Sequence, residues 1–414
     1  MSFSTPRLGV ICVLCVLAAG CIGEGVELVD VGAIDEEQLC GDGSVNGCVT
    51  SDGGGDEGLK DNEYVSQYIA HDVLDDGRGE EGADSGGRSE TGRCGLTHIN
   101  DSAPLTLGPQ DTGLVLSRVK ITNPDGVCVK ISGAKNVTIK DSLFVNCKIG
   151  VFADEATDIA IVGNRFEDVG SAVKIWHTKG GVRVSYNEYR NIGVIAQKGG
   201  ANFVELNRVS GSAISVNNNV GECVLELGCD PEDLVSIFKS EGSEDSPIEV
   251  VGNRFRGRGF SESGSGIVAG DYGGGYIAIR NNILINPGQV GIAIAGGHDI
   301  SIEGNTLYHD ADPRLVSSAP ILVGKWGGED KCYGHKLVNN HSNWYSSRGK
   351  ERIAWWPFGE SYNAECARGI VENRNNTPDL NEGSLVGYDE KINRGVLPRD
   401  IFSGLSKEYF SSCE

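Results

Sequence analysis

Several familiar signatures are missing from this sequence. The repeated region, residues 94–345, has no ten-residue stripe of helical periodicity, and the chain has no NTP-binding loop, zinc motif or redox motif. These absences argue against a leucine-rich horseshoe, a nucleotide-dependent enzyme and a zinc domain. The apolar run Leu8–Gly20 is too short to span a bilayer comfortably.

Positive charge is also scarce. The chain has 36 Lys and Arg against 58 Asp and Glu, a formal charge of −22. Residues 22–93 hold 19 of the acidic and four of the basic side chains, in Gly-rich runs without EF-hand spacing. Such a segment cannot bury enough apolar surface to fold, so we expect an acidic, disordered tether. The remaining charge of about −8 after the tether argues against nucleic acid as a partner.

The N-terminus has the features of an export signal. Arg7 precedes an apolar run, and LAAGC at 17–21 resembles a bacterial lipobox, with Ala rather than Leu three places before the cysteine. The resemblance implies residues 1–21 as a lipoprotein signal peptide and a lipid on Cys21. A cleaved secretory signal is the alternative. Ile22 favours the outer membrane, so we expect an extracytoplasmic protein that contacts the membrane through its lipid anchor only.

Cysteine is more abundant than a reducing compartment favours. Of 13 cysteines, ten remain after Cys12, Cys15 and Cys21 are set aside, and an even number indicates disulfides. Local pairs are plausible at Cys40/Cys48, Cys223/Cys229 and Cys332/Cys366. Partners for Cys94, Cys128, Cys147 and Cys413 do not follow from the sequence.

The pentapeptide VGNRF occurs twice, at 162–166 and 251–255. It belongs to a series of apolar-x-x-Asn-x-apolar units, most of them separated by one or two multiples of about 23 residues. A fixed period of about 20 to 50 residues indicates a solenoid. The corner positions of the series are Ser142, Asn164, Asn187, Asn207, Asn253, Asn282, Asn305 and Asn340.

Within each period the residues alternate between apolar and polar, as in YIAIRN at 276–281 and DISIEG at 299–304. This alternation predicts short strands, and strands of one period stacked in register form a parallel β-helix. Asparagine tolerates the left-handed backbone of a turn. We therefore expect each Asn to bond to its neighbours in the coils above and below.

The units GNRF, RNNILIN and IEGNTLY resemble the repeats of right-handed parallel β-helix proteins, the pectate-lyase-like superfamily. The resemblance covers residues 112–345 and implies an all-β, right-handed parallel β-helix, which we place at 94–345. A C-terminal cap and irregular tail follow at 346–414, where Trp355 and Trp356 cover the open end or, alternatively, stack on sugars. The superfamily includes lyases, hydrolases, epimerases and non-catalytic surface proteins, so the fold alone does not define an activity.

The second strand of each period predicts a ladder of outward side chains. Its last column mixes cations and acids beside aromatic residues, which suits an acidic polysaccharide: cations for carboxylates and aromatic faces for sugar rings. A solvated sheet edge is the alternative. The column contains Glu155, His177, Lys198, Asn218, Lys239, Asp271, Gly296 and Lys325, and the neighbouring aromatics are Trp176, Phe238, Tyr272 and Trp326.

The segment EDLVSIFKSEGS at 232–243 resembles a strand of family 6 polysaccharide lyases, the alginate and chondroitin lyases. The resemblance implies Lys239 as the base, and calcium, held by Glu232 or Asp233, as a cofactor. The next coil has Asp271 where an arginine acid is expected. We take Lys239, Asp271 and His177 as catalytic candidates. Hydrolysis by a carboxylate pair, Asp271 and Glu241 on adjacent coils, is the weaker alternative.

Two functions remain open at this stage. One is an exported carbohydrate-active enzyme, a lyase on an acidic polysaccharide. The other is a non-catalytic surface lipoprotein that binds polysaccharide or another cell-envelope component. In either case we expect a monomer.

Overall fold

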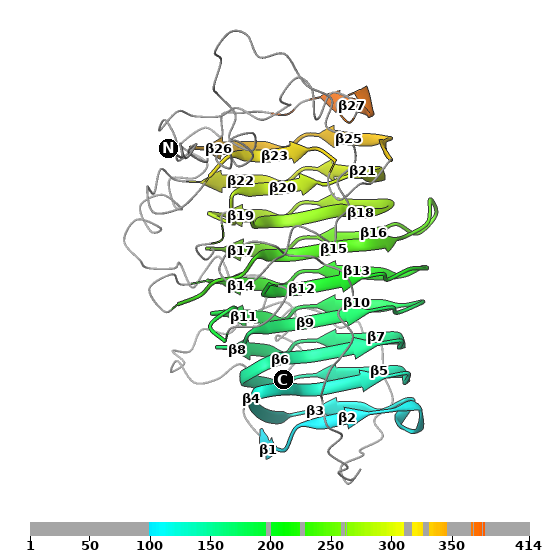
Figure 1. The fold of residues 1–414 in the computed structure, drawn as a ribbon, viewed down its shortest axis with the longest axis vertical. Coiled ribbons are helices and arrows are strands. Elements are labelled where there is room, and N and C mark those ends of the chain that lie inside the picture. Colours follow the sequence, from blue (N-terminus) through cyan, green and yellow to red (C-terminus); the bar gives the residue numbers. More distant parts are fainter. Residues whose placement is uncertain are drawn as a thin grey trace, which may run out of the picture. The chain divides into compact units, whose positions relative to one another are not determined.

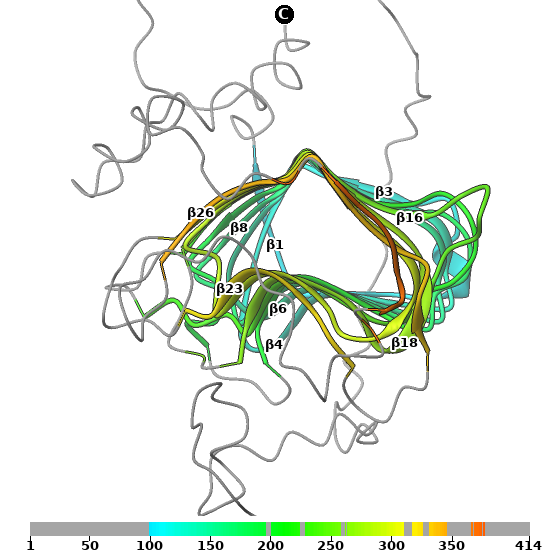
Figure 2. The same ribbon diagram turned by 90° about the horizontal axis from the view of Figure 1, so that it is seen from above.

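The computed structural model describes residues 99–195, 200–223, 228–257, 261, 263–309, 317–325, 331–345, 366, 368–374 and 376. The expected signal peptide, tether and lipid site at Cys21, and most of the expected cap, lie outside these residues. The described strands form a right-handed parallel β-helix, as predicted (Figure 1). Viewed along the axis, it is a three-sided coil (Figure 2).

We call the three sides walls A, B and C. Wall A contains β2 (Leu105–Leu107), β9 (Ser171–Trp176), β12 (Asn202–Asn207), β15 (Asp233–Glu241), β20 (Val290–Ile294) and β23 (Ala319–Val323). Wall B contains β3 (Val115–Ser117), β5 (Lys135–Lys140), β7 (Thr157–Val162), β10 (Val182–Ser185), β13 (Ile214–Asn217), β16 (Ile248–Val251), β21 (Gly297–Glu303), β24 (Cys332–Tyr333), β25 (His335–Val338) and β27 (Ile370–Arg374).

Wall C contains β1 (Asn100–Ser102), β8 (Arg165–Glu167), β11 (Glu188–Arg190), β14 (Val220–Glu222), β17 (Arg254–Arg256), β19 (Ile283–Ile285), β22 (Thr306–His309) and β26 (His341–Trp344). Three long strands turn a corner: β4 (Val119–Ser132) and β6 (Leu143–Asp154) run from wall C into wall A, and β18 (Ser265–Arg280) runs from wall A into wall B. A single turn of 3-10 helix, η3, covers Pro109–Asp111.

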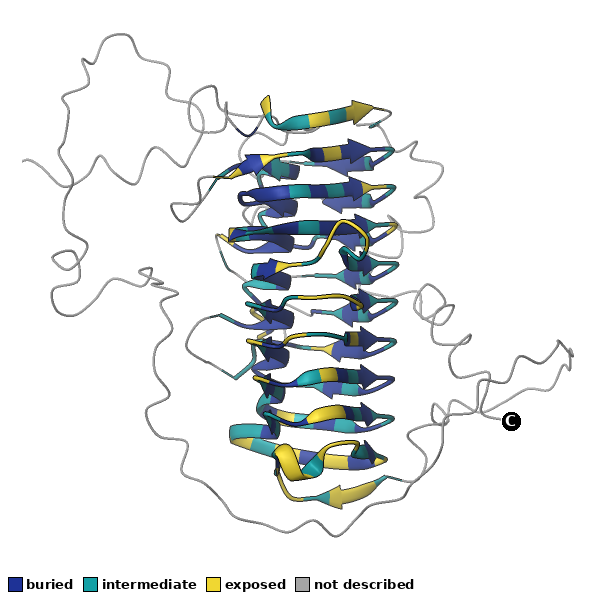
Figure 3. Ribbon diagram, turned by 90° about the vertical axis from the view of Figure 1, so that its right-hand side faces the viewer, coloured by how far each residue is buried: buried dark blue, intermediate teal, exposed yellow. Residues whose placement is uncertain are grey.

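The interior is apolar because alternate residues of each strand point inward. Figure 3 shows this as buried positions repeating from coil to coil. Phe144, Phe166, Tyr189 and Phe203 stack in sequence, with ring centroids 4.9–5.5 Å apart. Rings separated by about one coil spacing stabilise the stack through both burial and ring contact.

The corner between walls B and C is held by buried asparagines, as the sequence predicts. Asn187 Oδ1 accepts hydrogen bonds from Asn164 N at 2.9 Å and Asn164 Nδ2 at 3.1 Å, while Asn187 Nδ2 donates to Ile161 O of the preceding coil. Figure 2 shows successive ribbons superposing at this corner. The series is Ser142, Asn164, Asn187, Asn219, Asn253, Asn282, Asn305, Asn340 and Asn376.

Asn207 was wrongly placed in this series. It ends β12, which pairs with β9 and β15 in wall A, while Asn219, after β13, occupies the corner. The insertion between Asn187 and Asn253 lengthens two coils to 32 and 34 residues, and this hid the true position. At the other end, β27 pairs with β25 and Asn376 bonds to Asn340, so the stack continues past residue 345.

Disulfides join Cys128 to Cys147, Cys223 to Cys229, and Cys332 to Cys366. The last two confirm the predicted pairs, and the first joins two cysteines that the sequence left unassigned. Cys40, Cys48, Cys94 and Cys413 lie outside the described residues. No described helix is both long and apolar enough to cross a membrane.

Candidate functional site at the corner of walls A and B

One residue in each of five successive coils has a left-handed backbone at the corner where wall A turns into wall B. They are Glu155, His177, Arg208, Lys239 and Tyr272, with φ between 47° and 53°. Positive φ is uncommon for residues other than glycine. Because the turn repeats, the five side chains form a ladder of exposed or half-buried groups about 19 Å long, at about 4.8 Å per coil.

Arg208, Phe238, Lys239 and Tyr272 form a cation–aromatic group over the last three coils of this ladder. Lys239 Nζ lies 5.0 Å from the ring centroid of Phe238 and 4.8 Å from that of Tyr272. Arg208 Cζ lies 5.7 Å from the Phe238 centroid. These distances are within the range of cation–π attraction. The group presents two cations beside a Tyr272 ring that is 37% exposed.

Asp271 lies beside this group because of a β-bulge. Between β15 and β18 the register shifts, so that Ile237 pairs with Ala269 but Phe238 pairs with Asp271, leaving Gly270 unpaired. Burial raises the pKa of Asp271 to about 6, although its hydrogen bond with the Tyr272 backbone and the charge of Lys239 oppose the shift. Bulges often redirect side chains near active sites. A carboxyl group with this pKa exchanges a proton near neutral pH.

The sequence predicts that Asp271 lies directly above Lys239 in the ladder. The bulge instead moves Asp271 opposite Phe238 and places Tyr272 in the corner column. Ser240, next to Lys239, is fully buried, and its Oγ donates to backbone oxygen atoms and accepts from Val209 N at 2.9 Å. Ser240 is therefore part of the turn rather than of the surface group.

Asn218 was wrongly placed in the ladder. The segment Ile214–Asn217 forms β13 in wall B, and Asn218 Nδ2 donates to the Tyr186 hydroxyl at 3.2 Å. The wall A strand of that coil is β12, so Arg208 takes the corner position that the sequence analysis gave to Asn218. The spacing contained a usable signal, because Arg208 lies midway between His177 and Lys239 in the chain.

His177 and Trp176 belong to the adjoining coil. His177 Nδ1 lies 2.9 Å from Asp154 Oδ1, and Trp176 Nε1 donates to Glu205 Oε1 at 2.9 Å. Lys174 Nζ forms a buried ion pair with Glu205 Oε2 at 2.9 Å. His177 is two coils, or about 10 Å, from Lys239 along the axis, so these two catalytic candidates are not in direct contact.

The two candidate calcium ligands are not next to Lys239. Six residues of strand separate Asp233 from Lys239, which is about 20 Å between their Cα atoms. Burial raises the pKa of Asp233 well above its usual value, and Asp233 Oδ1 accepts a hydrogen bond from Ser265 N at 2.8 Å. Glu232 accepts from the hydroxyls of Ser261 and Ser263.

A carboxyl group that favours its protonated form is a poor calcium ligand. No group of three or more His, Cys, Asp or Glu side chains in the described part of the chain is arranged to hold a metal ion. We therefore derive no metal-dependent step from Glu232 and Asp233.

For the other residues that we expect to bind ligand, the structure shows only a position or nothing. Lys325 follows β23, three coils from Lys239 in wall A, and is half-buried. Lys198 and Trp326 lie outside the described residues. Gly296 has a positive φ of 130° near the same corner.

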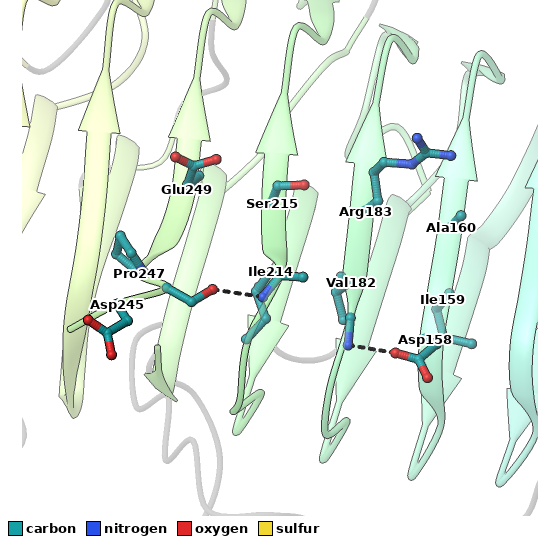
Figure 4. Close-up of a pocket in the computed structure, with 13 residues that line it drawn as sticks. Asp158, Ile159, Ala160, Val182, Arg183, Ile214, Ser215, Asp245, Pro247 and Glu249 are labelled. Atoms are coloured by element: carbon teal, nitrogen blue, oxygen red, sulfur yellow. Dashed lines mark hydrogen bonds between the residues drawn. The ribbon is translucent and has the colours of Figure 1, made fainter. Parts of the chain in front are cut away.

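A shallow hollow of about 600 Å³ lies on a different face, the outside of wall B (Figure 4). Its lining comes from β7, β10, β13 and β16, and one edge is the hairpin closed by the Ser243–Ser246 bridge. Ser246 Oγ accepts from Ala213 N, and Asp158 Oδ1 accepts from Gly181 N, both at 2.9 Å. These two bonds hold the edges of the hollow, which contains none of the predicted site residues.

No protein-family model matches the chain, and no curated protein sequence is significantly similar to it. Similar solved structures include the catalytic domain of a GH87 α-1,3-glucanase in complex with nigerose, with 12% identity and a TM-score of 0.37 over 66% of this chain and 56% of that one. An alginate lyase from Paenibacillus sp. str. FPU-7 has 14% identity and a TM-score of 0.36, over 60% of this chain and 91% of that one.

A third is DFA-IIIase from Arthrobacter chlorophenolicus A6 in complex with GF2, with 14% identity and a TM-score of 0.32 over 55% of this chain and 64% of that one. This chain thus spans little more than half the length of the glucanase domain. At these identities and TM-scores, the likeness carries no argument about a ligand or reaction.

Proposed function

We propose that this protein is a carbohydrate-active β-helix protein that binds an acidic polysaccharide along the corner of walls A and B. The observation that carries the proposal is the cation–aromatic group, in which Lys239 Nζ lies within 5.0 Å of both the Phe238 and Tyr272 ring centroids, with Arg208 one coil away. This pairing suits a uronate, because a cation attracts its carboxylate and an aromatic face packs against the apolar side of a sugar ring.

The ladder also has the dimensions that a chain-like ligand requires. Its five corner residues span about 19 Å, longer than one sugar unit. Arg208 and Lys239 occupy its third and fourth coils, and Glu155 lies at the far end. A carboxylate of an acidic chain would therefore be held at these two coils.

A second candidate function, β-elimination at the same corner, is favoured by the pKa of Asp271, raised to about 6 by burial. In this reaction a base removes the proton at C5 of the uronate. The electron pair of that C–H bond forms the C4–C5 double bond, the C4–O4 bond breaks, and an acid protonates O4. Arg208 would pair with the carboxylate, neutral Lys239 would act as the base, and protonated Asp271 as the acid.

Binding comes before elimination in this proposal because the cations and rings of the group suffice for it. Elimination requires in addition that a lysine accept a proton from the sugar. Binding alone therefore needs fewer steps at the same corner.

The test is a screen of alginate, pectate, chondroitin and related polymers, with and without calcium, that records both retention and ultraviolet absorbance. Elimination creates a double bond conjugated with the carboxyl group, which absorbs in the ultraviolet. We expect Lys239→Ala to weaken retention by about tenfold at low salt. Lys120→Ala makes the same change of charge at an exposed residue of wall C and serves as the control.

The outcomes separate the functions. If polymer is retained and neither wild type nor Lys239→Ala gives an ultraviolet-absorbing product, the result supports binding only. An ultraviolet-absorbing product that Lys239→Ala abolishes, with thermal unfolding unchanged, supports elimination. If no polymer is retained and no product forms, both functions are contradicted.

A further inference from the structure

A second cluster of ionisable and aromatic groups lies just beyond the cation–aromatic group, where wall B begins. It consists of Glu241, Tyr276, His298, Asp299 and Tyr333, and we call it the His298 platform. Glu241, Gly275, His298 and Tyr333 are register partners in four successive coils. His298 and Asp299 belong to β21, which begins at Gly297.

Both nitrogens of the His298 ring face carboxylates. Nδ1 lies 2.9 Å from Asp299 Oδ2, and Nε2 lies 3.5 Å from Glu241 Oε1. The imidazole itself is buried, with its side chain 7% exposed, while the carboxylates are 40% and 52% exposed. The carboxylates therefore remain open to a ligand, and the imidazole orients them.

Glycine makes the contact between Glu241 and His298 feasible. Their coils are separated by the coil of Gly275, and a Cβ at Gly275 would lie 2.6 Å from the His298 ring. Without that side chain, Glu241 and His298 reach each other across two coils. The imidazole ring thus fills the space that an ordinary residue at Gly275 would occupy.

Tyr333 provides the open aromatic surface of the platform. Its ring stacks on the His298 ring with centroids 5.5 Å apart and planes at 14°, and the residue is 49% exposed. Tyr276 packs edge-on against His298 at 5.1 Å. The disulfide between Cys332 and Cys366 fixes the strand that carries Tyr333.

In the platform the His298 ring lies between two carboxylates and the open Tyr333 ring stacks on it, an arrangement suited to a hydroxyl-rich ring without negative charge. The aromatic face packs against the apolar side of the sugar, and the carboxylates accept hydrogen bonds from its hydroxyls. A second uronate is disfavoured here, because its carboxylate would face Glu241 and Asp299. The platform is thus opposite in charge to the neighbouring group at Arg208 and Lys239.

The platform and the cation–aromatic group are contiguous. Glu241 is two residues after Lys239 on β15, about 7 Å along the strand, and buried Ser240 lies between them. Resting on the proposed function, we propose that the ligand is a mixed polysaccharide. A uronate lies at Arg208 and Lys239, and a sugar without a carboxylate, further along the same chain, lies on the His298 platform, whose Tyr333 is three coils, about 14 Å along the axis, from Lys239.

Titration of three oligosaccharides of equal length onto the full chain tests this inference. The first is an oligogalacturonide, in which every unit is a uronate. The second alternates glucuronate with N-acetylglucosamine, and the third alternates glucuronate with glucosamine. We expect both alternating chains to bind about tenfold or more tightly than the oligogalacturonide. A stronger preference for the third identifies the amino group, and equal affinities identify a neutral ring.

Tyr333→Ala should remove this preference while leaving oligogalacturonide affinity unchanged, and Tyr333→Phe should keep it, since the phenyl ring remains. Glu241→Gln should reduce the preference for the glucosamine chain. Equal binding of all three oligosaccharides to wild type, or a preference that survives Tyr333→Ala, overturns the inference but not the proposed function. Binding that Lys239→Ala leaves unchanged counts against the proposed function itself.

Discussion

Burial raises the pKa of Asp271 to about 6, even though Lys239 attracts the carboxylate. A carboxylate that folding removes from water lowers the stability of the native state at every pH where it is ionised. Asp271 therefore has a cost in stability that a neutral side chain at the same position would not have. Such conflicts between stability and local chemistry are concentrated at functional sites.

Replacement of Asp271 by Asn should stabilise the protein in a pH-dependent way. The folded-state pKa is about 6 and the usual pKa of an aspartate is 3.8, so wild-type stability falls as the pH rises from about 4 to about 6. We expect the Tm of Asp271→Asn to exceed that of wild type by roughly 3 °C at pH 7.5 and to match it at pH 3.5. Thermal unfolding by circular dichroism measures both values.

Asp101→Asn, an exposed substitution on β1, is the control for a general effect of charge. A Tm difference for Asp271→Asn that is the same at pH 3.5 and pH 7.5 would contradict the pKa assignment.

A second prediction concerns the buried ion pair of Lys174 and Glu205, whose side chains are 5% and 11% exposed. Removing one charge leaves the other buried without compensation, which typically costs about 3 to 5 kcal/mol. We expect Glu205→Leu to lower the free energy of unfolding by about 3 kcal/mol. The double variant Lys174→Met/Glu205→Leu should recover most of the loss, and chemical denaturation measures both. A double variant no more stable than Glu205→Leu would exclude charge burial as the cause.

At the scale of the element, the asparagine corner determines how the strands register from coil to coil. Each buried amide bonds to the backbone of one coil and to the asparagine of the next. Asn253 Nδ2 donates to Val216 O at 2.8 Å and to Asn282 Oδ1 at 2.9 Å, while its Oδ1 accepts from Asn219 N at 2.9 Å. Because the network passes through every coil, one substitution affects three coils.

Asn253→Ala should therefore destabilise the fold by about 3 kcal/mol or more, since buried groups left without partners cost about 1 to 3 kcal/mol each. Asn218→Ala, one residue from the corner, loses the hydrogen bond to Tyr186 and puts an alanine at a φ of 55°, which together should cost about 1 to 2 kcal/mol. Urea unfolding of both variants gives the comparison. Equal losses of unfolding free energy for the two variants would show that the buried asparagine series makes no special contribution to stability.

The sequence predicted the fold well because each coil repeats one local rule: a polar corner residue between strands of alternating burial. It predicted the site less well. Arg208 and Asn218 exchanged roles because an insertion changed the length of the coil, and Asp271 moved because the Gly270 bulge shifted the register. Contacts such as that between Glu241 and His298 join residues 57 positions apart across two coils. No local sequence pattern predicts such a contact.

At the scale of the molecule, the described β-helix presents its proposed binding corner along the axis, so that a long ligand crosses several coils. An exported, tethered protein would hold this surface away from the membrane. Residues 22–93, with 19 acidic and four basic side chains, have the composition of an extended linker. That arrangement depends on the lipid expected at Cys21, which lies outside the described residues.

Replacement of Cys21 by Ser tests this arrangement, because a serine has no thiol to carry the diacylglyceryl thioether. We expect Cys21→Ser to move the protein from the membrane fraction to the soluble fraction, since each buried methylene of a lipid contributes about 0.8 kcal/mol to membrane binding. Far-ultraviolet circular dichroism should show the same strand content as wild type. Cys15→Ser, within the expected signal peptide, should leave the distribution unchanged. Wild-type protein found wholly in the soluble fraction, with no acyl group on its mature N-terminus, would instead indicate a cleaved secretory signal.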